Sequence, residues 1–123
     1  MIPGKRILIV EDEALVAMLL EDMVLALGLE VVGPESQLEH ALAIAESEPL
    51  DAAVLDINLN GNSSYEVADA LRHRGIPYAF ATGYGHSGVN PAHAGVPVLS
   101  KPYSSEDVTR TLAALLGPLV RPV

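Results

Sequence analysis

The chain has 123 residues, half of them hydrophobic, and carries 16 acidic against 7 basic side chains, a net charge of −9. This length fits one domain, which we expect to span residues 1–123, and so few basic residues argue against direct binding to nucleic acid. The chain has no apolar run of membrane-spanning length, no signal-peptide pattern and no cysteine, so we expect a cytoplasmic protein.

The first half of the chain alternates between short apolar runs and helical patterns. An apolar run predicts a strand at 7–10, and the helical pattern over 13–27 ends at Gly28, a residue type that closes helices in the left-handed conformation. A short strand is predicted at 31–32. The helix predicted over 36–47 opens with the Ser-x-x-Glu spacing of a capping box.

The second half continues this alternation. A buried strand is predicted at 52–55, and a second capping-box pattern opens a helix over 63–75, which ends at a glycine. Two further strands are predicted at 78–81 and 96–99. The last helix follows Ser104, with apolar residues at helical spacing.

Five strands alternating with helices predict an α/β domain whose parallel sheet is covered by helices on both faces. The commonest arrangement at this size is the doubly wound, flavodoxin-like strand order 2-1-3-4-5. The connection between Thr82 and Lys101 is unusual, since four of its 18 residues are Gly and two are Pro. Both residue types disfavour helices, so we expect the fourth helix to be short or disordered.

Polar residues stand at the ends of the predicted strands: Glu11, Asp12, Asp56, Thr82 and Lys101. The carboxyl ends of parallel strands share one edge of the sheet, so we expect these side chains to converge. Singly, each has a structural interpretation as a helix cap, a turn residue or a surface charge. Their coincidence instead indicates a site, because three crowded carboxylates repel one another unless a divalent cation such as Mg²⁺ offsets their charge.

Such a site suits phosphoryl chemistry. A carboxylate can attack a phosphoryl group when the charge on the transferring oxygens is neutralised, as in aspartyl-phosphate enzymes. Mg²⁺ would take one of these oxygens, the Thr82 hydroxyl would donate to a second and Lys101 would pair with the third. The set therefore indicates a phosphoryl acceptor.

The motifs Ile-Val-Glu-Asp at 9–12, Asp56 after an apolar strand, Thr82 before a glycine and Lys-Pro-Tyr at 101–103 together resemble the receiver domain of two-component response regulators. The resemblance covers the whole chain. It implies that Asp56 is the phosphorylation site and that Thr82 is the switch hydroxyl. It also implies that Lys101 binds the phosphoryl group and precedes a cis proline.

The resemblance further implies how Mg²⁺ is held. Asp12 and Asp56 would bind the ion directly, Glu11 would bind it through water, and Asn58 would contribute its backbone carbonyl. On this interpretation the protein is a signalling protein and not an enzyme, apart from its own phosphotransfer and autodephosphorylation.

Two features separate the chain from many receivers. The aromatic residue that often lies three positions before the lysine is replaced by Val98, so the usual aromatic relay is absent. The sequence Phe-Ala-Thr-Gly at 80–83 resembles the subgroup named for that motif, which is associated with stress signalling and with sensor histidine kinases of the HWE and HisKA2 types. We expect segment 83–95 to act as the switch, and we expect no metal site from His86 and His93, which lie within it.

We therefore expect a single-domain response regulator that accepts a phosphoryl group from a sensor histidine kinase onto Asp56. It would signal through a changed protein surface or act as a phosphate sink. One alternative is an aspartyl-phosphate phosphatase of the haloacid dehalogenase type, although that chemistry normally uses a second acid where this chain has Asn58. Another is a receiver-like scaffold that binds partners without phosphorylation.

The first helix is also informative. An inward-facing stripe is predicted to comprise Val16, Leu19, Leu20, Met23 and Leu27. Ala14, Met18 and Leu25 then have no obvious packing partner. They belong either to a broader core stripe or to a docking surface, and the family resemblance favours docking of the kinase.

Overall fold

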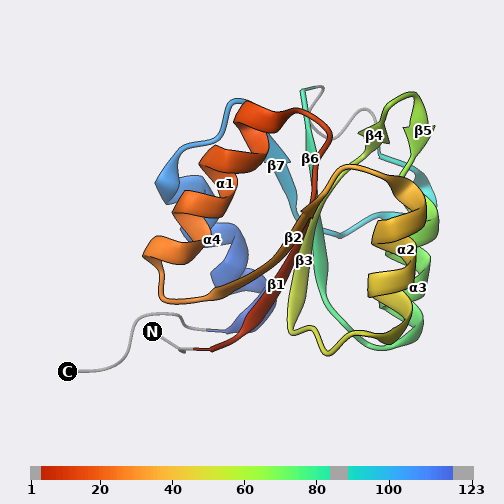
Figure 1. Ribbon diagram of the computed structural model, residues 1–123, viewed down its shortest axis with the longest axis horizontal. Helices are drawn as coiled ribbons and strands as arrows, with labels where there is room; N and C mark the ends of the chain where they lie inside the picture. Colours follow the sequence, from red (N-terminus) through yellow and green to blue (C-terminus); the bar gives the residue numbers. More distant parts are fainter. Residues whose placement is uncertain (1–3, 84–88, 118–123) are drawn as a thin grey trace.

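The computed structural model describes residues 4–83 and 89–117. Its five-stranded parallel sheet comprises β1 (Arg6–Val10), β2 (Glu30–Glu35), β3 (Ala52–Asp56), β6 (Tyr78–Thr82) and β7 (Val98–Ser100). The strands lie in the order β2-β1-β3-β6-β7 (Figure 1). This confirms the predicted order 2-1-3-4-5, with β6 and β7 as the fourth and fifth strands.

Two pairs of helices cover the sheet. Helices α1 (Ala14–Ala26) and α4 (Ser105–Leu116) lie on one face, and α2 (Leu38–Ser47) and α3 (Tyr65–His73) lie on the other (Figure 1). Both predicted glycine stops adopt positive φ, Gly28 at 82° and Gly75 at 74°. In the described ranges, no helix combines the length and hydropathy that crossing a bilayer requires.

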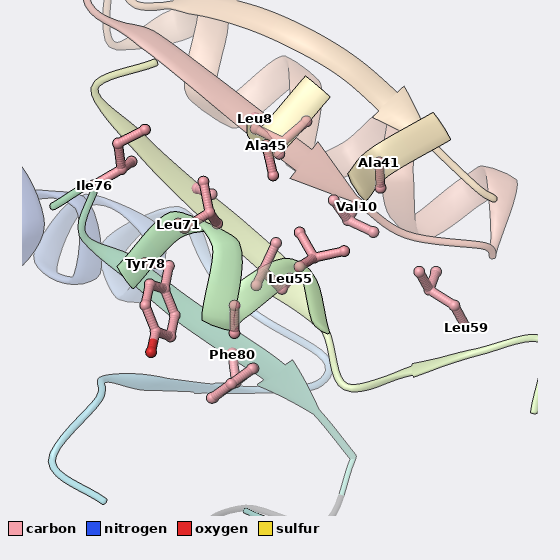
Figure 2. Packing of buried hydrophobic residues seen from close by; sticks show 13 residues of the cluster. Leu8, Val10, Ala41, Ala45, Leu55, Leu59, Leu71, Ile76, Tyr78 and Phe80 are labelled. Carbon is pink, nitrogen blue, oxygen red and sulfur yellow. The ribbon is translucent and has the colours of Figure 1, made fainter. Parts of the chain in front are cut away.

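The alternation of side chains along the strands builds a separate core under each helix pair. On the α2 and α3 side, Leu8, Val10, Leu55 and Phe80 are fully or almost fully buried (Figure 2). On the other side, Ile7, Ile9, Val54 and Leu99 pack beneath α1 and α4. Each fully buried side chain of this size contributes roughly 1.5–3 kcal/mol. The central strands are therefore fixed on both faces, which holds their carboxyl ends in register.

Two of the predicted helix starts are wrong in detail. Helix α2 begins one residue late, with Gln37 as its N-cap and no side-chain capping bond, so Ser36 lies outside the helix. The N-cap of α3 is Ser64, and its side chain makes no capping bond. Ser63 pairs in a short strand instead of capping the helix, and its Oγ accepts the Tyr65 N–H at 3.1 Å. A capping box forms instead at α4, between Ser104 and Asp107.

A hairpin beside the sheet was not predicted. Strands β4 (Asn58–Leu59) and β5 (Asn62–Ser63) pair antiparallel across a two-residue turn. The turn residues Asn60 and Gly61 have φ values of 51° and 86°, which is the conformation that favours Asn-Gly in tight hairpins. The Asn-Gly pair was the sequence signal for this element.

The described part of the region between β6 and β7 carries little helix. Among the described residues between these strands, the helical structure is the 3₁₀ turn η2 (Pro91–His93), capped by Asn90, whose Oδ1 accepts the Ala92 N–H at 2.9 Å. This turn lies between β6 and β7, where a short or disordered helix was expected. Residues 84–88, which include His86, lie outside the described residues. The Lys101–Pro102 peptide bond is cis, as the resemblance implied, and Gly33–Pro34 is cis as well.

The inward stripe of α1 differs from the predicted one. The buried residues are Ala17, Leu20 and Val24, whereas Leu19, predicted to face inward, is 57% exposed. The helix is apolar around most of its circumference, so the hydrophobic pattern alone did not fix its rotation. Met18 and Leu25 are exposed and form no part of a broader core stripe.

Candidate functional site

The residues predicted at the strand ends come together at the carboxyl edge of the sheet. Asp12, Asp56, Thr82 and Lys101 line a pocket of about 530 Å³. Glu11 lies beneath them and is buried. Neighbouring strands bring these residues together, since β3 pairs with both β1 and β6.

Three carboxylates crowd one side of this pocket. Glu11, Asp12 and Asp56 each place an oxygen within 4.8 Å of the others, a spacing that allows them to share a cation. The first two follow β1 directly, and Asp56 is the last residue of β3. The backbone of two adjacent strands therefore forces these like charges together.

Lys101 is the cation that faces them. Its Nζ lies 3.0 Å from Asp56 Oδ2 and 3.0 Å from Glu11 Oε1, with the more exposed Glu13 at 3.5 Å. Burial alone would lower the pKa of Lys101, but its contacts with Glu11 and Asp56 raise it above its ordinary value. The lysine is therefore charged at neutral pH, and its backbone N–H is fixed by the Thr82 carbonyl at 2.9 Å.

One lysine does not balance the acids. Burial, followed by the adjacent Asp56 carboxylate, raises the pKa of Glu11 to about 7 despite its contact with Lys101. Lys101 Nζ is the partner of the buried Glu11 Oε1, and the Glu13 N–H donates to Glu11 Oε2 at 3.1 Å. Three carboxylates that share one lysine keep a net negative charge, and carboxylate oxygens are the ligands that hard divalent cations prefer. The cluster therefore fits Mg²⁺.

The hairpin supplies backbone donors to two of these carboxylates. The Asn58 N–H donates to Asp56 Oδ1 at 3.3 Å, and the Asn60 N–H donates to Asp12 Oδ2 at 2.9 Å. Burial acts to raise the pKa of Asp12, but this bond and the N–H of Asp12 itself hold that pKa below its usual range. Sequence reasoning singled out Asn58 and missed Asn60, because the contact depends on the turn.

Two further bonds hold the hairpin over the site. The Asn60 side-chain amide donates to the Ser36 carbonyl at 3.2 Å, which ties the turn to the loop between β2 and α2. The Gly61 N–H donates to Asn58 Oδ1 at 2.9 Å. The turn therefore has a defined position from which it orients Asp12.

Thr82 is placed as the sequence predicted. It is the last residue of β6, beside the end of β3, and it is only 5% exposed. Gly83 follows it and also lines the pocket. The pocket thus combines a carboxylate framed by a backbone donor, a lysine and a hydroxyl with a cluster suited to a cation, which is what a phosphoryl group needs.

Comparison with known proteins gives a consistent result. The sequence profile of the family described as "Response regulator receiver domain" matches residues 7–113. The solution structure of SdrG from Sphingomonas melonis Fr1 is 45% identical, with a TM-score of 0.84 over 94% of this chain and 99% of that one. SdrG has also been solved in a BeF3-activated conformation.

Two other matches bear on the site. The receiver domain of the sensor histidine kinase PA1611 from Pseudomonas aeruginosa PAO1, solved with a magnesium ion coordinated in its active-site cleft, is 27% identical, with a TM-score of 0.81 over 94% of this chain and 99% of that one. The acid tolerance regulatory protein ActR from Rhizobium meliloti is 32% identical over 125 residues, 98% of this chain and 64% of ActR. The chain spans about half to two thirds of the length of the curated relatives it matches.

Proposed function

We propose that this chain, which belongs to the response regulator receiver domain family, accepts a phosphoryl group on Asp56 from a sensor histidine kinase. The observation that carries the proposal is the pairing of Asp56 with both Lys101 Nζ, at 3.0 Å, and the Asn58 N–H, at 3.3 Å, inside an acidic pocket. Glu11 has partners of the same kinds, Lys101 Nζ at 3.0 Å and the Glu13 N–H at 3.1 Å, but Asp56 is distinguished because it also lines the open pocket. Receivers are signalling domains, so the product is a modified protein and not a released metabolite.

The residues of the chain have distinct tasks in this reaction. A carboxylate oxygen of Asp56 attacks phosphorus, the bond from phosphorus to the donor's imidazole nitrogen breaks, and that nitrogen leaves with the electron pair. Lys101 changes partner from the Asp56 carboxylate to a phosphoryl oxygen. The Thr82 hydroxyl donates to another phosphoryl oxygen, which reports the modification to β6. Attack by water later returns Asp56 to its carboxylate form.

The acidic cluster would hold Mg²⁺ through Asp12 and Asp56, with the Asn58 carbonyl as a further ligand and Glu11 acting through water. When bound, the ion would neutralise charge on the phosphoryl oxygens. The support for this assignment is the spacing of the three carboxylates and the single lysine that faces them.

The biological setting follows from the relatives. We assign residues 1–123 to one receiver domain like SdrG, which matches over 94% of this chain and 99% of that one. The kinase would be of the HWE or HisKA2 type, and the pathway one of stress signalling, an assignment that the acid-tolerance name of ActR supports. The output is either a surface that changes on phosphorylation or removal of phosphate from a relay.

The proposal is tested by treating the protein with acetyl phosphate and Mg²⁺ and measuring its intact mass. We expect one labile phosphoryl adduct that is absent from Asp56→Asn and retained in the control Asp22→Asn, which alters an exposed acid on α1. Sustained turnover of phosphate esters would instead indicate a phosphatase. A wild-type protein that forms no adduct and shows no turnover would contradict phosphorylation and indicate a binding scaffold.

A further inference from the structure

Three of the aromatic residues of this chain are gathered around one histidine. The chain has four Tyr and one Phe, and three of these rings, Tyr65, Tyr78 and Phe80, surround His93. The Tyr65 ring is stacked on the imidazole with a centroid distance of 5.2 Å and an interplanar angle of 9°. Phe80 meets both rings edge-on at 5.5 Å. His93, expected only to lie in a glycine-rich segment, is therefore a core residue.

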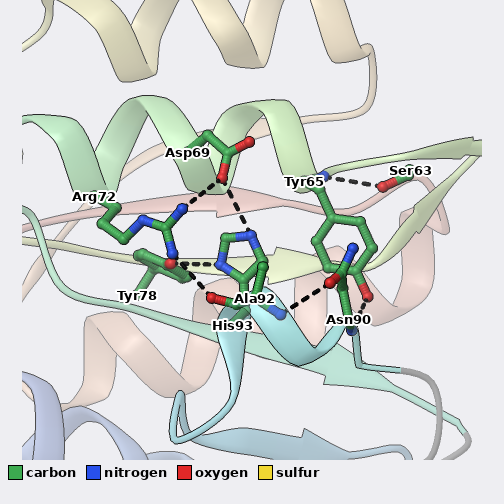
Figure 3. A network of polar contacts seen from close by, with 8 residues as sticks. All are labelled: Ser63, Tyr65, Asp69, Arg72, Tyr78, Asn90, Ala92 and His93. Carbon is green, nitrogen blue, oxygen red and sulfur yellow. Dashed lines mark hydrogen bonds and ion pairs between the residues drawn. The ribbon is translucent and has the colours of Figure 1, made fainter.

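The imidazole of His93 is also fully bonded. Its side chain is 2% exposed, with Nδ1 2.7 Å from the Tyr78 hydroxyl and Nε2 3.2 Å from Asp69 Oδ1 (Figure 3). Both ring nitrogens therefore have a polar partner, the Asp69 carboxylate at Nε2 and the Tyr78 hydroxyl at Nδ1. The bonds join η2, which carries His93, to both α3 and β6.

Two more side chains of α3 hold the same segment. The Tyr65 hydroxyl accepts the Asn90 N–H at 2.7 Å, and Arg72 donates from Nη1 to the Ala92 carbonyl at 3.0 Å (Figure 3). Arg72 is itself fixed by Asp69, at 3.2 Å. We call this set the α3 latch, and it comprises Tyr65, Asp69 and Arg72 of α3 together with Asn90, Ala92 and His93.

The latch is connected to the phosphoacceptor site along two routes. Phe80 packs on Tyr65 and His93 and lies two residues before Thr82 in β6. Tyr65 begins α3 directly after the hairpin whose backbone donates to Asp56. The position that carries the aromatic relay in many receivers is Val98 in this chain. The aromatic link to the site therefore runs towards α3 and not towards β7.

We propose that Tyr65 and His93 are positioning residues that couple the state of Asp56 to helix α3 through the α3 latch. The inference rests on the proposed function, because it assumes that Asp56 is the modified residue. When Thr82 turns towards a phosphoryl group, the end of β6 shifts, and Phe80 passes that shift to the rings of Tyr65 and His93. The bond from the Asn90 N–H to the Tyr65 hydroxyl ties the segment of His93 to the start of α3, so the shift reaches the helix.

The experiment measures hydrogen exchange of α3 amides, residues 65–73, with and without beryllofluoride and Mg²⁺. In the wild type we expect exchange to change on beryllofluoride binding. In Tyr65→Phe, which loses one hydroxyl and keeps the ring, we expect that change to fall about fivefold, the scale of one hydrogen bond. Tyr65→Leu, which also loses the stacking, should remove the response, while both variants still bind beryllofluoride.

The matched control is Thr109→Val, which removes one hydroxyl that donates to the Ser105 carbonyl in α4, on the opposite face. It should leave the α3 response unchanged. If Tyr65→Leu does not fold, Tyr65→Phe alone decides. If the wild type binds beryllofluoride without an α3 response, or if Tyr65→Phe keeps the full response, the coupling through the α3 latch is wrong. The proposed function would be unaffected by either result. A wild type that binds no beryllofluoride would overturn the proposed function and the coupling with it.

Discussion

The acidic cluster of Glu11, Asp12 and Asp56 and the α3 latch are both polar groups set against the same sheet, but their charges are balanced differently. In the acidic cluster one lysine faces three carboxylates, and burial raises the pKa of Glu11 to about 7. In the latch, each ring nitrogen of His93 has a polar partner. The difference indicates that the cluster is built to take a ligand, whereas the latch is complete by itself.

The strongest test of this difference removes His93. His93→Ala leaves a cavity and an unpaired Tyr78 hydroxyl in the core, so we expect the free energy of unfolding to fall by about 3 kcal/mol. Chemical denaturation measures this. His73→Ala, at the exposed end of α3, should change stability by less than about 0.5 kcal/mol. Equal effects for the two variants would show that the latch is not a structural unit.

The acidic cluster should respond with the opposite sign. Glu11→Gln removes the carboxylate whose pKa burial and Asp56 raise to about 7, so at about pH 8 and without Mg²⁺ we expect stability to rise by about 1 kcal/mol. Asp12→Asn should instead lose most of the stabilisation that Mg²⁺ gives the wild type. Thermal unfolding with and without Mg²⁺ measures both effects. A metal-free Glu11→Gln protein that is less stable than the wild type would contradict charge imbalance as the basis of the site.

A smaller effect is expected at the hairpin turn. Gly61 has a φ of 86°, so Gly61→Ala should cost about 1 kcal/mol and, by shifting Asn60, weaken Mg²⁺ binding a few-fold. Gly75→Ala is matched, because Gly75 has a φ of 74° and both positions have open space around a new Cβ, but it lies away from the site. Gly75→Ala should lower the free energy of unfolding by a similar amount and leave the Mg²⁺ affinity unchanged. Isothermal titration with Mg²⁺ separates the two variants, and equal affinities would remove the turn from the site.

The smallest effect lies outside both regions and sets the scale for a local interaction. Ser104→Ala removes the capping bond of α4 and should cost about 0.5 kcal/mol. Hydrogen bonds from Ser104 hold the pKa of Asp107 below its usual value near 3.8. A lowered pKa stabilises the fold above the unfolded-state pKa, and that contribution is lost as pH falls through the folded-state value. In urea titrations, the difference in the free energy of unfolding between wild type and Ser104→Ala should therefore shrink below about pH 4. A difference that grows there would contradict this linkage to Asp107.

The sheet and its site were predictable because they depend on local patterns. Apolar runs fix the strands, and Asp56, Thr82 and Lys101 follow from strand ends that must share an edge. The start of α3 was not predictable in the same way, because Ser63 pairs in the hairpin and does not cap the helix. His93 escaped prediction for a different reason. Its partners lie 15 and 24 residues earlier in the chain, and only the packed structure brings them to it.

The central claim is that one carboxylate among the three, Asp56, accepts the phosphoryl group. Treatment of the phosphorylated protein with tritiated borohydride reduces an acyl phosphate to an alcohol and labels that residue, which peptide mapping then locates. We predict a single labelled position, residue 56, dependent on Mg²⁺ during phosphorylation. Label at Glu11 or Asp12, or no labelled peptide, would contradict the account.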